Sequence, residues 1–333
     1  MIRLWTGRSR LAVDADRKSV YSGSRRRFDA CLTAMSDSAA HAPSAPFADL
    51  DRARAYLPPG FFEARLPVGD TTRLAQRQLA VVLRAVATYL PRHLVRTELG
   101  RLHTAPQPAR GEFLHGALAF ADISGFTALS ERLGALGREG AEQITEVVNR
   151  YFKRMLGIVF AHGGDVFKFG GDALLVFYPD GAAPGIVTAL TASWHMQQAM
   201  SEFEQVRTTV GSFPLRMKIG LNAGPIFTAR LGAADDRQFI VTGGMVNATA
   251  RAESLSFAGE ILVTPQARAV LEHTSLKAEF IAGPEGHFLL QALSKPPDVT
   301  ADAPPLPEVI TLPDQLAALD RLTPYLPHGL LPR

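Results

Sequence analysis

Apolar positions between residues 113 and 295 follow strand and helix periodicities in turn. Residues 117–123 are apolar almost throughout, which is typical of a buried central strand, and residues 138–162 repeat apolar side chains every three or four positions, as a helix does. The short apolar runs 165–169 and 173–177 are joined by Gly-Gly and predict a hairpin. Beyond them the pattern predicts a helix at 184–208 and strands at 215–221 and 238–242. A further helix is expected from about 245, followed by a short strand at 260–263.

The flanking segments have different patterns. Residues 48–110 show helical spacing of apolar side chains and predict a small helical N-terminal region. Residues 1–47 lack any periodicity and are expected to form a disordered basic tail, within which Met35 is an alternative start to Met1. Residues 296–333 are rich in proline and are expected to be a linker. The predicted domain of mixed strands and helices is therefore 111–295.

The tripeptide Tyr-Leu-Pro occurs three times, at 56–58, 89–91 and 325–327. Each copy ends an amphipathic stretch, as expected because proline disfavours a helical conformation in the residue before it. One interpretation is a helix stop that is used three times. The other is that the tripeptide introduces a domain, so that the last copy would lead to a second unit and the chain would be a fragment of a tandem protein.

Two aspartates stand next to predicted strands. Asp122 ends the apolar run 117–123 and precedes a Gly-containing turn and a helical pattern. Asp172 follows the Gly-Gly of the predicted hairpin. A lone aspartate at a strand end is usually a turn residue or a helix cap. Two of them brought together in a sheet would instead offer the oxygen ligands that Mg²⁺ prefers beside phosphate oxygens.

Three ordered strings decide between these interpretations: Phe-Ala-Asp-Ile-Ser-Gly-Phe-Thr at 120–127, Lys-Phe-Gly-Gly-Asp-Ala-Leu at 168–174, and Thr-Gly-Gly-Met-Val-Asn-Ala-Thr-Ala-Arg at 242–251. Together they resemble the class III adenylate/guanylate cyclase catalytic domain over about 113–295. Gly-Gly-Asp also occurs in diguanylate cyclases, but those need Glu-Phe next, and Ala-Leu follows here. The resemblance implies an α+β fold, a ferredoxin-like antiparallel sheet with helices on one face.

The resemblance also implies roles for the first two strings. Asp122 and Asp172 would bind two Mg²⁺ ions, for which Mn²⁺ can substitute, with the Ile123 carbonyl as a further ligand. Backbone N–H groups of Gly125, Phe126 and Thr127 would hold the β- and γ-phosphates of the substrate. The implied reaction is attack of the ribose 3′-oxygen on the α-phosphorus, which gives a cyclic nucleotide and pyrophosphate.

The remaining implied roles concern the ribose, the transition state and the base. Asn247 would orient the ribose, and Arg251 would stabilise the transition state. Lys168 matches the position that contacts the purine and, as a donor to adenine N1, favours ATP over GTP. Ile240 stands where adenylate cyclases usually place Asp or Thr, and its side chain can accept no hydrogen bond from the base.

Sites of this class form between two domains, one of which supplies the metal aspartates and the other the purine contact, Asn and Arg. The chain retains both sets, so a homodimer could make two sites. It is also similar to the first half of tandem soluble adenylate cyclases, in which a second cyclase domain supplies the base pocket. The alternative prediction is therefore a half-site or non-catalytic regulatory module that needs such a domain.

Charge and composition exclude other classes. The isoelectric point near 9.1 is typical of nucleic-acid binding, yet residues 1–27 carry eight Lys/Arg and two Asp, a net +6, while the 333-residue chain totals +3. The remainder therefore sums to −3, which argues against a nucleic-acid partner. One cysteine, no apolar run long enough to span a membrane and no secretory signal predict a cytoplasmic protein with no membrane span.

Overall fold

The computed structural model describes residues 45–63, 67–105, 109–294, 308–327 and 330. Within this part, eight strands form one sheet in the order β2-β3-β1-β6-β8-β10-β9, with β7 paired to β6. All pairs are antiparallel except β6 with β8. The strands are β1 (Arg110–Ser124), β2 (Asp165–Gly170), β3 (Ala173–Pro179), β6 (Arg216–Gly232), β7 (Arg237–Thr242), β8 (Ile261–Val263), β9 (Lys277–Ala282) and β10 (Phe288–Ser294).

Two long central strands organise this sheet. β1 and β6 pair from Arg110 opposite Arg230 at one end to Ser124 opposite Arg216 at the other. Because side chains alternate along a strand, Ala119, Ala121 and Ile123 face one core while Leu118 and Phe120 face another. The sheet is thus buried on both faces along β1, which explains why its sequence is apolar almost throughout.

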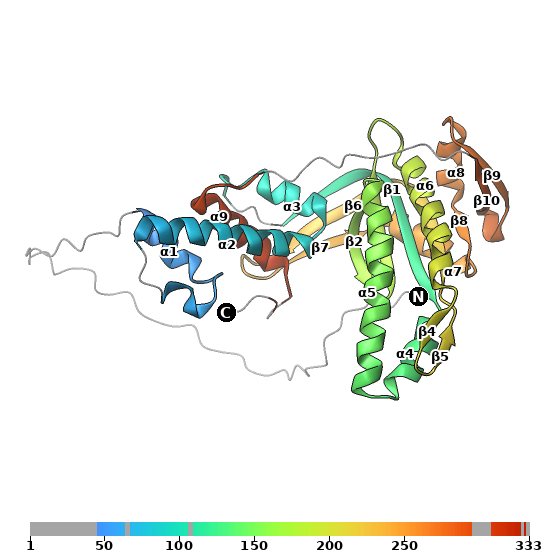
Figure 1. The fold of residues 1–333 in the computed structure, drawn as a ribbon. Coiled ribbons are helices and arrows are strands. Elements are labelled where there is room, and N and C mark those ends of the chain that lie inside the picture. Colours follow the sequence, from blue (N-terminus) through green and yellow to red (C-terminus); the bar gives the residue numbers. More distant parts are fainter. Residues whose placement is uncertain (1–44, 64–66, 106–108, 295–307, 328–329, 331–333) are drawn as a thin grey trace, which may run out of the picture. The chain divides into compact units, whose positions relative to one another are not determined.

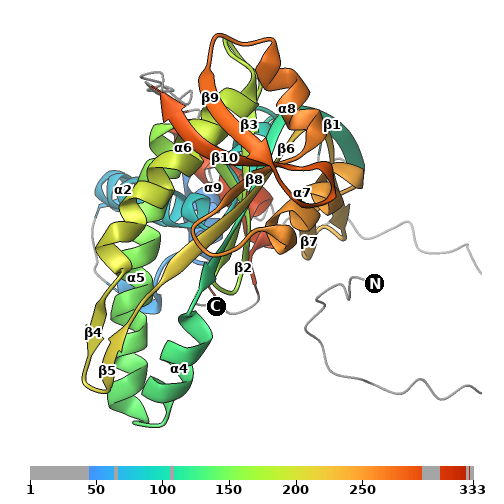
Figure 2. The same ribbon diagram turned by 90° about the vertical axis from the view of Figure 1, so that its right-hand side faces the viewer.

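Helices cover the two faces unequally. α4 (Phe126–Gly134), α5 (Arg138–Ala161), α6 (Gly185–Ala199) and α8 (Pro265–Glu272) contribute to the larger core with the first face. α7 (Gly244–Leu255) packs on the second face, where its Met245 joins Leu118 and Phe167. Figure 2 shows α5 and α6 on one side of the central strands and α7 on the other.

The short elements are η2 (Met200–Phe203), η3 (Pro284–Gly286) and the ribbon of β4 (Val206–Thr208) and β5 (Gly211–Phe213).

A second group of helices has its own apolar core. α1 (Ala45–Ala53), α2 (Val68–Thr88), α3 (Arg92–Leu99) and α9 (Leu312–Leu322) bury side chains that include Leu79, Leu83, Leu316 and Leu319. α2 and α9 lie side by side although more than 200 positions separate them in the sequence (Figure 1). The 3-10 helices η1 (Pro59–Phe62) and η4 (Thr323–Tyr325) flank this group.

An aspartate of the sheet caps one of these helices. Asp165, at the start of β2, accepts hydrogen bonds from the backbone N–H groups of Arg92 at 2.8 Å and His93 at 2.7 Å. These N–H groups open α3 and have no partner within the helix. Burial raises the pKa of Asp165, and the two N–H donors act in the opposite direction. The carboxylate therefore fixes the first turn of α3 to the edge of the sheet.

The predicted α+β fold is confirmed, and details differ. The strand predicted at 215–221 is β6 and runs on to Gly232, because it continues its pairing with β1 past Gly224. The helix predicted at 184–208 ends at Ala199, after which the chain forms η2 and β4. Helices were expected on one face, and α7 occupies the other.

The C-terminal segment also differs from its prediction. Part of the linker expected at 296–333 is helical, since α9 packs into the core of the helical region and is followed by the short helix η4. The expected disordered tail lies outside the described residues except for 45–47, which belong to α1. The first two Tyr-Leu-Pro copies follow α1 and α2, and the third begins at Tyr325, the last residue of η4. All three positions are as expected for helix stops. The boundaries of the parts stay predictions.

Replacing Gly220 by alanine is predicted to destabilise the domain. A Cβ at Gly220 of β6 would lie 2.2 Å from the backbone nitrogen of Glu253 and 2.6 Å from the carbonyl oxygen of Thr249, so α7 would have to move. We expect G220A to lower the free energy of unfolding by about 2 kcal/mol, as overpacking does. The control is G157A in α5, whose Cβ meets nothing within 4 Å and which should be neutral or stabilising. Denaturant unfolding measures both, and equal stability of the two variants would contradict the close packing of α7.

Candidate active site

Asp122 lies near the end of β1, on the face that carries α7. Its side chain is 27% exposed, and its Oδ2 is 3.5 Å from Nζ of Lys218, the residue opposite it on β6. Lys218 also contacts Glu253 of α7, with 2.7 Å between Nζ and Oε1. One ammonium group therefore bridges a carboxylate of the sheet and a carboxylate of the helix.

The charges in this bridge act on one another. Burial by itself would lower the pKa of Lys218, but the hydrogen bond and negative charge of Glu253, together with Asp122, raise it overall. Burial raises the pKa of Glu253, and Lys218 opposes that shift. Lys218 is thus held as a cation beside Asp122, where it can offset the charge of anionic groups.

The turn after Asp122 needs glycine. Gly125 has φ +98°, and a Cβ there would lie 2.5 Å from the carbonyl oxygen of Pro214. The turn leads directly into α4, whose first residues are Phe126 and Thr127 and whose N-terminus has no side-chain cap. The first backbone N–H groups of a helix lack partners within it and favour anions. Gly125–Thr127 can therefore hold phosphate oxygens as the resemblance implies.

Asp172 comes to the same place from a different element. It lies in the β2–β3 turn after Gly171, which has φ +73°. Burial raises the pKa of Asp172, the negative charge of Asp122 raises it further, and Lys218 lowers it. Asp172 lines an apolar pocket with about 310 Å³ of empty space, part of it open to solvent, whose lining also includes Ile123, Phe126, Tyr151 and Gly171. The structure therefore brings Asp122, Ile123, the Gly125 turn and Asp172 together.

The two aspartates fit a metal ion that takes most of its ligands from the substrate and from water. No group of three or more Cys, His, Asp or Glu side chains in the described residues could hold an ion by itself. Mg²⁺ commonly binds one or two carboxylates and completes its shell with substrate phosphates and water. The Tyr151 hydroxyl is buried without a hydrogen-bond partner in this structure, and its pKa is raised by burial and by both aspartates. A cation between the aspartates would offset this concentration of negative charge.

The residues assigned to the base lie on β2 and β7. Lys168 is exposed, and Ile240 is half-buried. The two strands meet through Phe167 and Phe239, whose rings contact each other edge to face with centroids 5.4 Å apart. Side-chain alternation on β7 puts Ile240 on the face opposite Phe239 and Val241. Lys168 and Ile240 are thus on two strands of the same sheet that do not pair with each other, because β2 pairs with β3 and β7 with β6.

Asn247 and Arg251 lie four residues apart on the exposed side of α7. Arg251 forms a two-pronged ion pair with Glu285 of η3, in which Nε is 2.9 Å from Oε2 and Nη2 contacts Oε1. Glu285 has φ +52°, which is uncommon for a residue other than glycine. The described contacts of Arg251 are therefore with η3, whereas those of Asp122 are with β6.

Several residues of this region were missed by sequence reasoning. Lys218 is the one cation inside the apolar run 217–221, and this could have marked it, but only the β1–β6 register shows that it faces Asp122. Glu253 follows Arg251 by two positions and so lies on the buried side of the helix. The sequence around Glu285 and Tyr151 gave no sign of a role at the site, because the residues that they approach there lie in distant segments of the chain.

The comparisons with known proteins agree with this geometry. The family model described as the adenylate and guanylate cyclase catalytic domain matches residues 113–295, more than half of the chain. The chain therefore belongs to that family, the class III nucleotidyl cyclases. The recognition of the class from the three sequence strings is confirmed.

Among curated relatives, the rabbit (Oryctolagus cuniculus) adenylate cyclase type 10 is 28% identical over 233 residues, which cover 68% of this chain and 14% of that protein. Adenylate cyclase 1 of Rhizobium meliloti is 24% identical over 172 residues, 51% of this chain and 25% of that protein. The chain thus spans a quarter or less of the length of these relatives. A bacterial light-regulated adenylyl cyclase shares the fold with a TM-score of 0.51 at 17% identity, over 77% of this chain and 68% of that one.

No helix in the described ranges is both long and apolar enough to cross a membrane. The cytoplasmic location and the lack of a nucleic-acid partner stay predictions.

The electrostatics predict how pH affects metal binding. Asp172 must be ionised to bind a cation, and its raised pKa means that binding is lost on acidification at a higher pH than for an ordinary aspartate, whose pKa is about 3.9. Because Lys218 lowers the pKa of Asp172, K218Q should move this loss to still higher pH. The control is K153Q, an exposed lysine of α5. Calorimetric titration of Mn²⁺ between pH 4 and 7.5 measures the shift, and superimposable profiles of K218Q and K153Q would refute it.

Proposed function

We propose that the chain is the catalytic unit of an adenylate cyclase, which converts ATP to cyclic AMP and pyrophosphate. The observation that carries this proposal is the meeting of Asp122, Asp172 and the uncapped N-terminus of α4 at one place. This arrangement offers carboxylates for metal ions beside N–H groups for phosphates. Relatives that are named adenylate cyclase support the choice of product.

Each group has a chemical task in the proposed reaction. Two Mg²⁺ ions, or Mn²⁺, held by Asp122, Asp172 and the Ile123 carbonyl would acidify the ribose 3′-hydroxyl and neutralise charge on the phosphates. The Gly125–Thr127 turn would bind the β- and γ-phosphates. Lys218 adds a fixed positive charge beside Asp122 that can attract the triphosphate. Asn247 would orient the ribose, and Arg251 would stabilise negative charge in the transition state.

Because Asn247 and Arg251 lie on the exposed side of α7, we infer that they serve a site completed by a second cyclase domain. In a homodimer, the α7 residues of one chain would meet the aspartates of its partner. Arg251 would then have to leave Glu285, to which it is bound in the single chain. A second domain of a longer protein could take the partner's place, which is the half-site alternative.

A complementation experiment tests this arrangement. D122A and R251A should each be inactive alone, because every homodimeric site then lacks one half. Mixed in equal amounts, they should recover about a quarter of the wild-type rate, since half of the dimers are mixed and each of these has one intact site. The readout is cyclic AMP formed from ATP with Mg²⁺ or Mn²⁺.

The matched control is a mixture of D122A with D172A, which lack groups of the same half and should stay inactive. Recovery in that control, or none with R251A, would contradict the shared site. A wild-type chain that binds ATP but makes no cyclic nucleotide would support the half-site alternative.

The choice of base is a separate prediction. Lys168 is proposed to donate a hydrogen bond to adenine N1, and guanine has an N–H at that position. K168E should therefore lower kcat/KM for ATP about tenfold or more and raise the relative use of GTP, because a mismatched donor or acceptor in the base pocket costs 1–3 kcal/mol. K153E, an equal charge change on α5, is the control. Equal turnover of ATP and GTP by the wild-type chain would overturn this role.

A further inference from the structure

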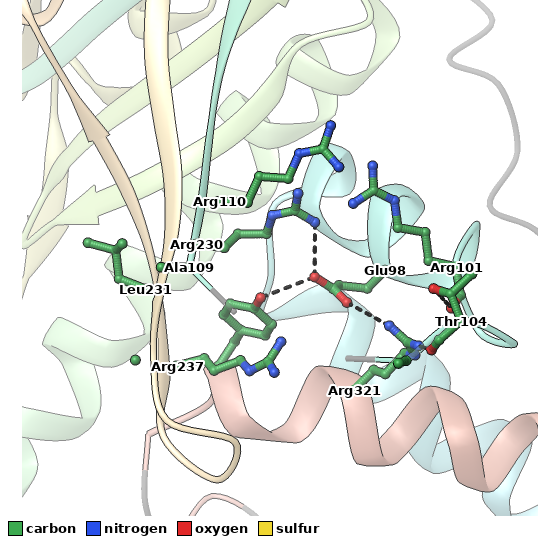
Figure 3. A pocket seen from close by; sticks show the side chains of 12 residues that line it. Glu98, Arg101, Thr104, Ala109, Arg110, Arg230, Leu231, Arg237 and Arg321 are labelled. Carbon is green, nitrogen blue, oxygen red and sulfur yellow. Dashed lines mark hydrogen bonds and ion pairs between the residues drawn. The ribbon is translucent and has the colours of Figure 1, made fainter. Parts of the chain in front are cut away.

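A basic pocket lies at the other ends of the strands that carry Asp122 and Lys218. Its lining includes Arg110 at the start of β1, Arg230 near the end of β6 and Arg237 at the start of β7. The helical region completes it with Glu98 of α3, Arg101 just after that helix, Arg321 of α9 and Tyr325 of η4. We call this set the arginine pocket (Figure 3).

Glu98 is the one acidic residue among those that line the pocket, and its charge is already compensated. The residue is 3% exposed. Its carboxylate accepts hydrogen bonds from Nη1 of Arg230 at 3.1 Å, from Nη1 of Arg321 at 3.4 Å and from the Tyr325 hydroxyl at 3.1 Å. Glu98 pairs with Arg230 and Arg321 and does not neutralise Arg101.

Arg230 retains unused capacity to donate. The residue is 8% exposed, and its Nη2 is buried without a hydrogen-bond partner in this structure. The nearest carboxylate oxygen that pairs with Nη2 belongs to Glu112, at 3.9 Å, and Glu112 is also bound by His93 at 3.2 Å. A buried guanidinium N–H without a partner is costly, so this atom favours an acceptor from outside the chain.

Other cations gather at the same place. Figure 3 shows the guanidinium groups of Arg101, Arg110 and Arg230 on one side of Glu98. No ion pair joins Arg101 to another residue of the described chain. Five arginines and one glutamate give the lining a formal charge of +4. Arginine forks of this kind bind tetrahedral oxyanions through paired N–H donors.

The size of the pocket limits the ligand. It contains about 390 Å³ of empty space, part of it open to solvent, and a water-sized sphere can move through only about 20 Å³ of this space. Because this volume counts only positions of the centre of the sphere, it leaves room for the closely spaced atoms of one tetrahedral oxyanion but not for a nucleoside. The pocket therefore fits a single phosphate group rather than a whole nucleotide.

We propose that the arginine pocket binds one phosphate-type oxyanion, and that this anion stabilises the contact of α3 and α9 with the sheet. The bound anion would accept hydrogen bonds from Arg230 Nη2 and Arg101 and would offset the repulsion among the arginines. It would do so about one strand length away from the active-site residues, since β1 and β6 run from this pocket to Asp122 and Lys218.

The test measures binding of inorganic phosphate to the full chain. Equilibrium dialysis with labelled phosphate is done at constant ionic strength in chloride with EDTA, which removes metal-dependent binding at the active site. We expect saturable binding of one phosphate per chain and a rise in Tm that saturates with it. R101Q should weaken binding about tenfold, because it removes one charge-assisted hydrogen bond. R101Q is not expected to unfold the protein, since it breaks no ion pair that involves Glu98.

The matched control is R77Q, an exposed arginine of α2 outside the pocket, which should bind phosphate like the wild-type chain. Adding ATP in the same EDTA buffer tells whether a phosphate group can enter the pocket while attached to a nucleotide. If ATP displaces labelled phosphate, it can; if ATP does not, the site binds the free ion. Absence of saturable binding, or equal weakening by R101Q and R77Q, would overturn the proposal.

Discussion

The ion bridge of Lys218 with Asp122 and Glu253 joins the two parts of the chain that carry the proposed site residues. It connects the end of β1, where the proposed metal ligand Asp122 lies, with α7, which carries Asn247 and Arg251. Gly220 permits the close approach of α7 that this bridge requires. Buried charges are stable only when they are paired, so the bridge fixes both the position of the helix and the protonation state of Lys218.

The ion bridge fixes the position of α7 and therefore the side of the domain on which Asn247 and Arg251 lie relative to the aspartates. The aspartates lie together with the N-terminus of α4, while Asn247 and Arg251 occupy the opposite, exposed side of α7, where Glu285 holds the arginine. The two sets have different contact partners in the domain, and we propose that they are two half-sites. A second domain is needed for catalysis in this account, and the ion pair with Glu285 is the contact that its arrival would replace. The arginine pocket adds a separate connection, from the helical region to the far ends of β1 and β6.

Most of the fold could be predicted from the sequence, and the structure brings together Asp122, Ile123, the Gly125 turn and Asp172 of the predicted site, whose roles stay predictions. The apolar runs and the Gly-Gly turn predicted β1, the hairpin and α5, because these depend on local periodicity. The residues that depend on register or on distant packing could not be predicted: Lys218 opposite Asp122, Asp165 as the cap of α3, Glu285 beside Arg251, and the cluster around Glu98. The helix α9 was missed because the prolines before it favoured a linker, although Thr311 caps its N-terminus and its leucines repeat with helical spacing.

We propose that one chain holds two complementary half-sites that act only when a second domain completes them. The dependence of cyclic AMP formation on the concentration of the purified chain tests this proposal. The specific activity should rise with protein concentration and level off once dimers predominate. A specific activity that stays constant and nonzero on dilution, while sedimentation shows only monomers, would contradict it.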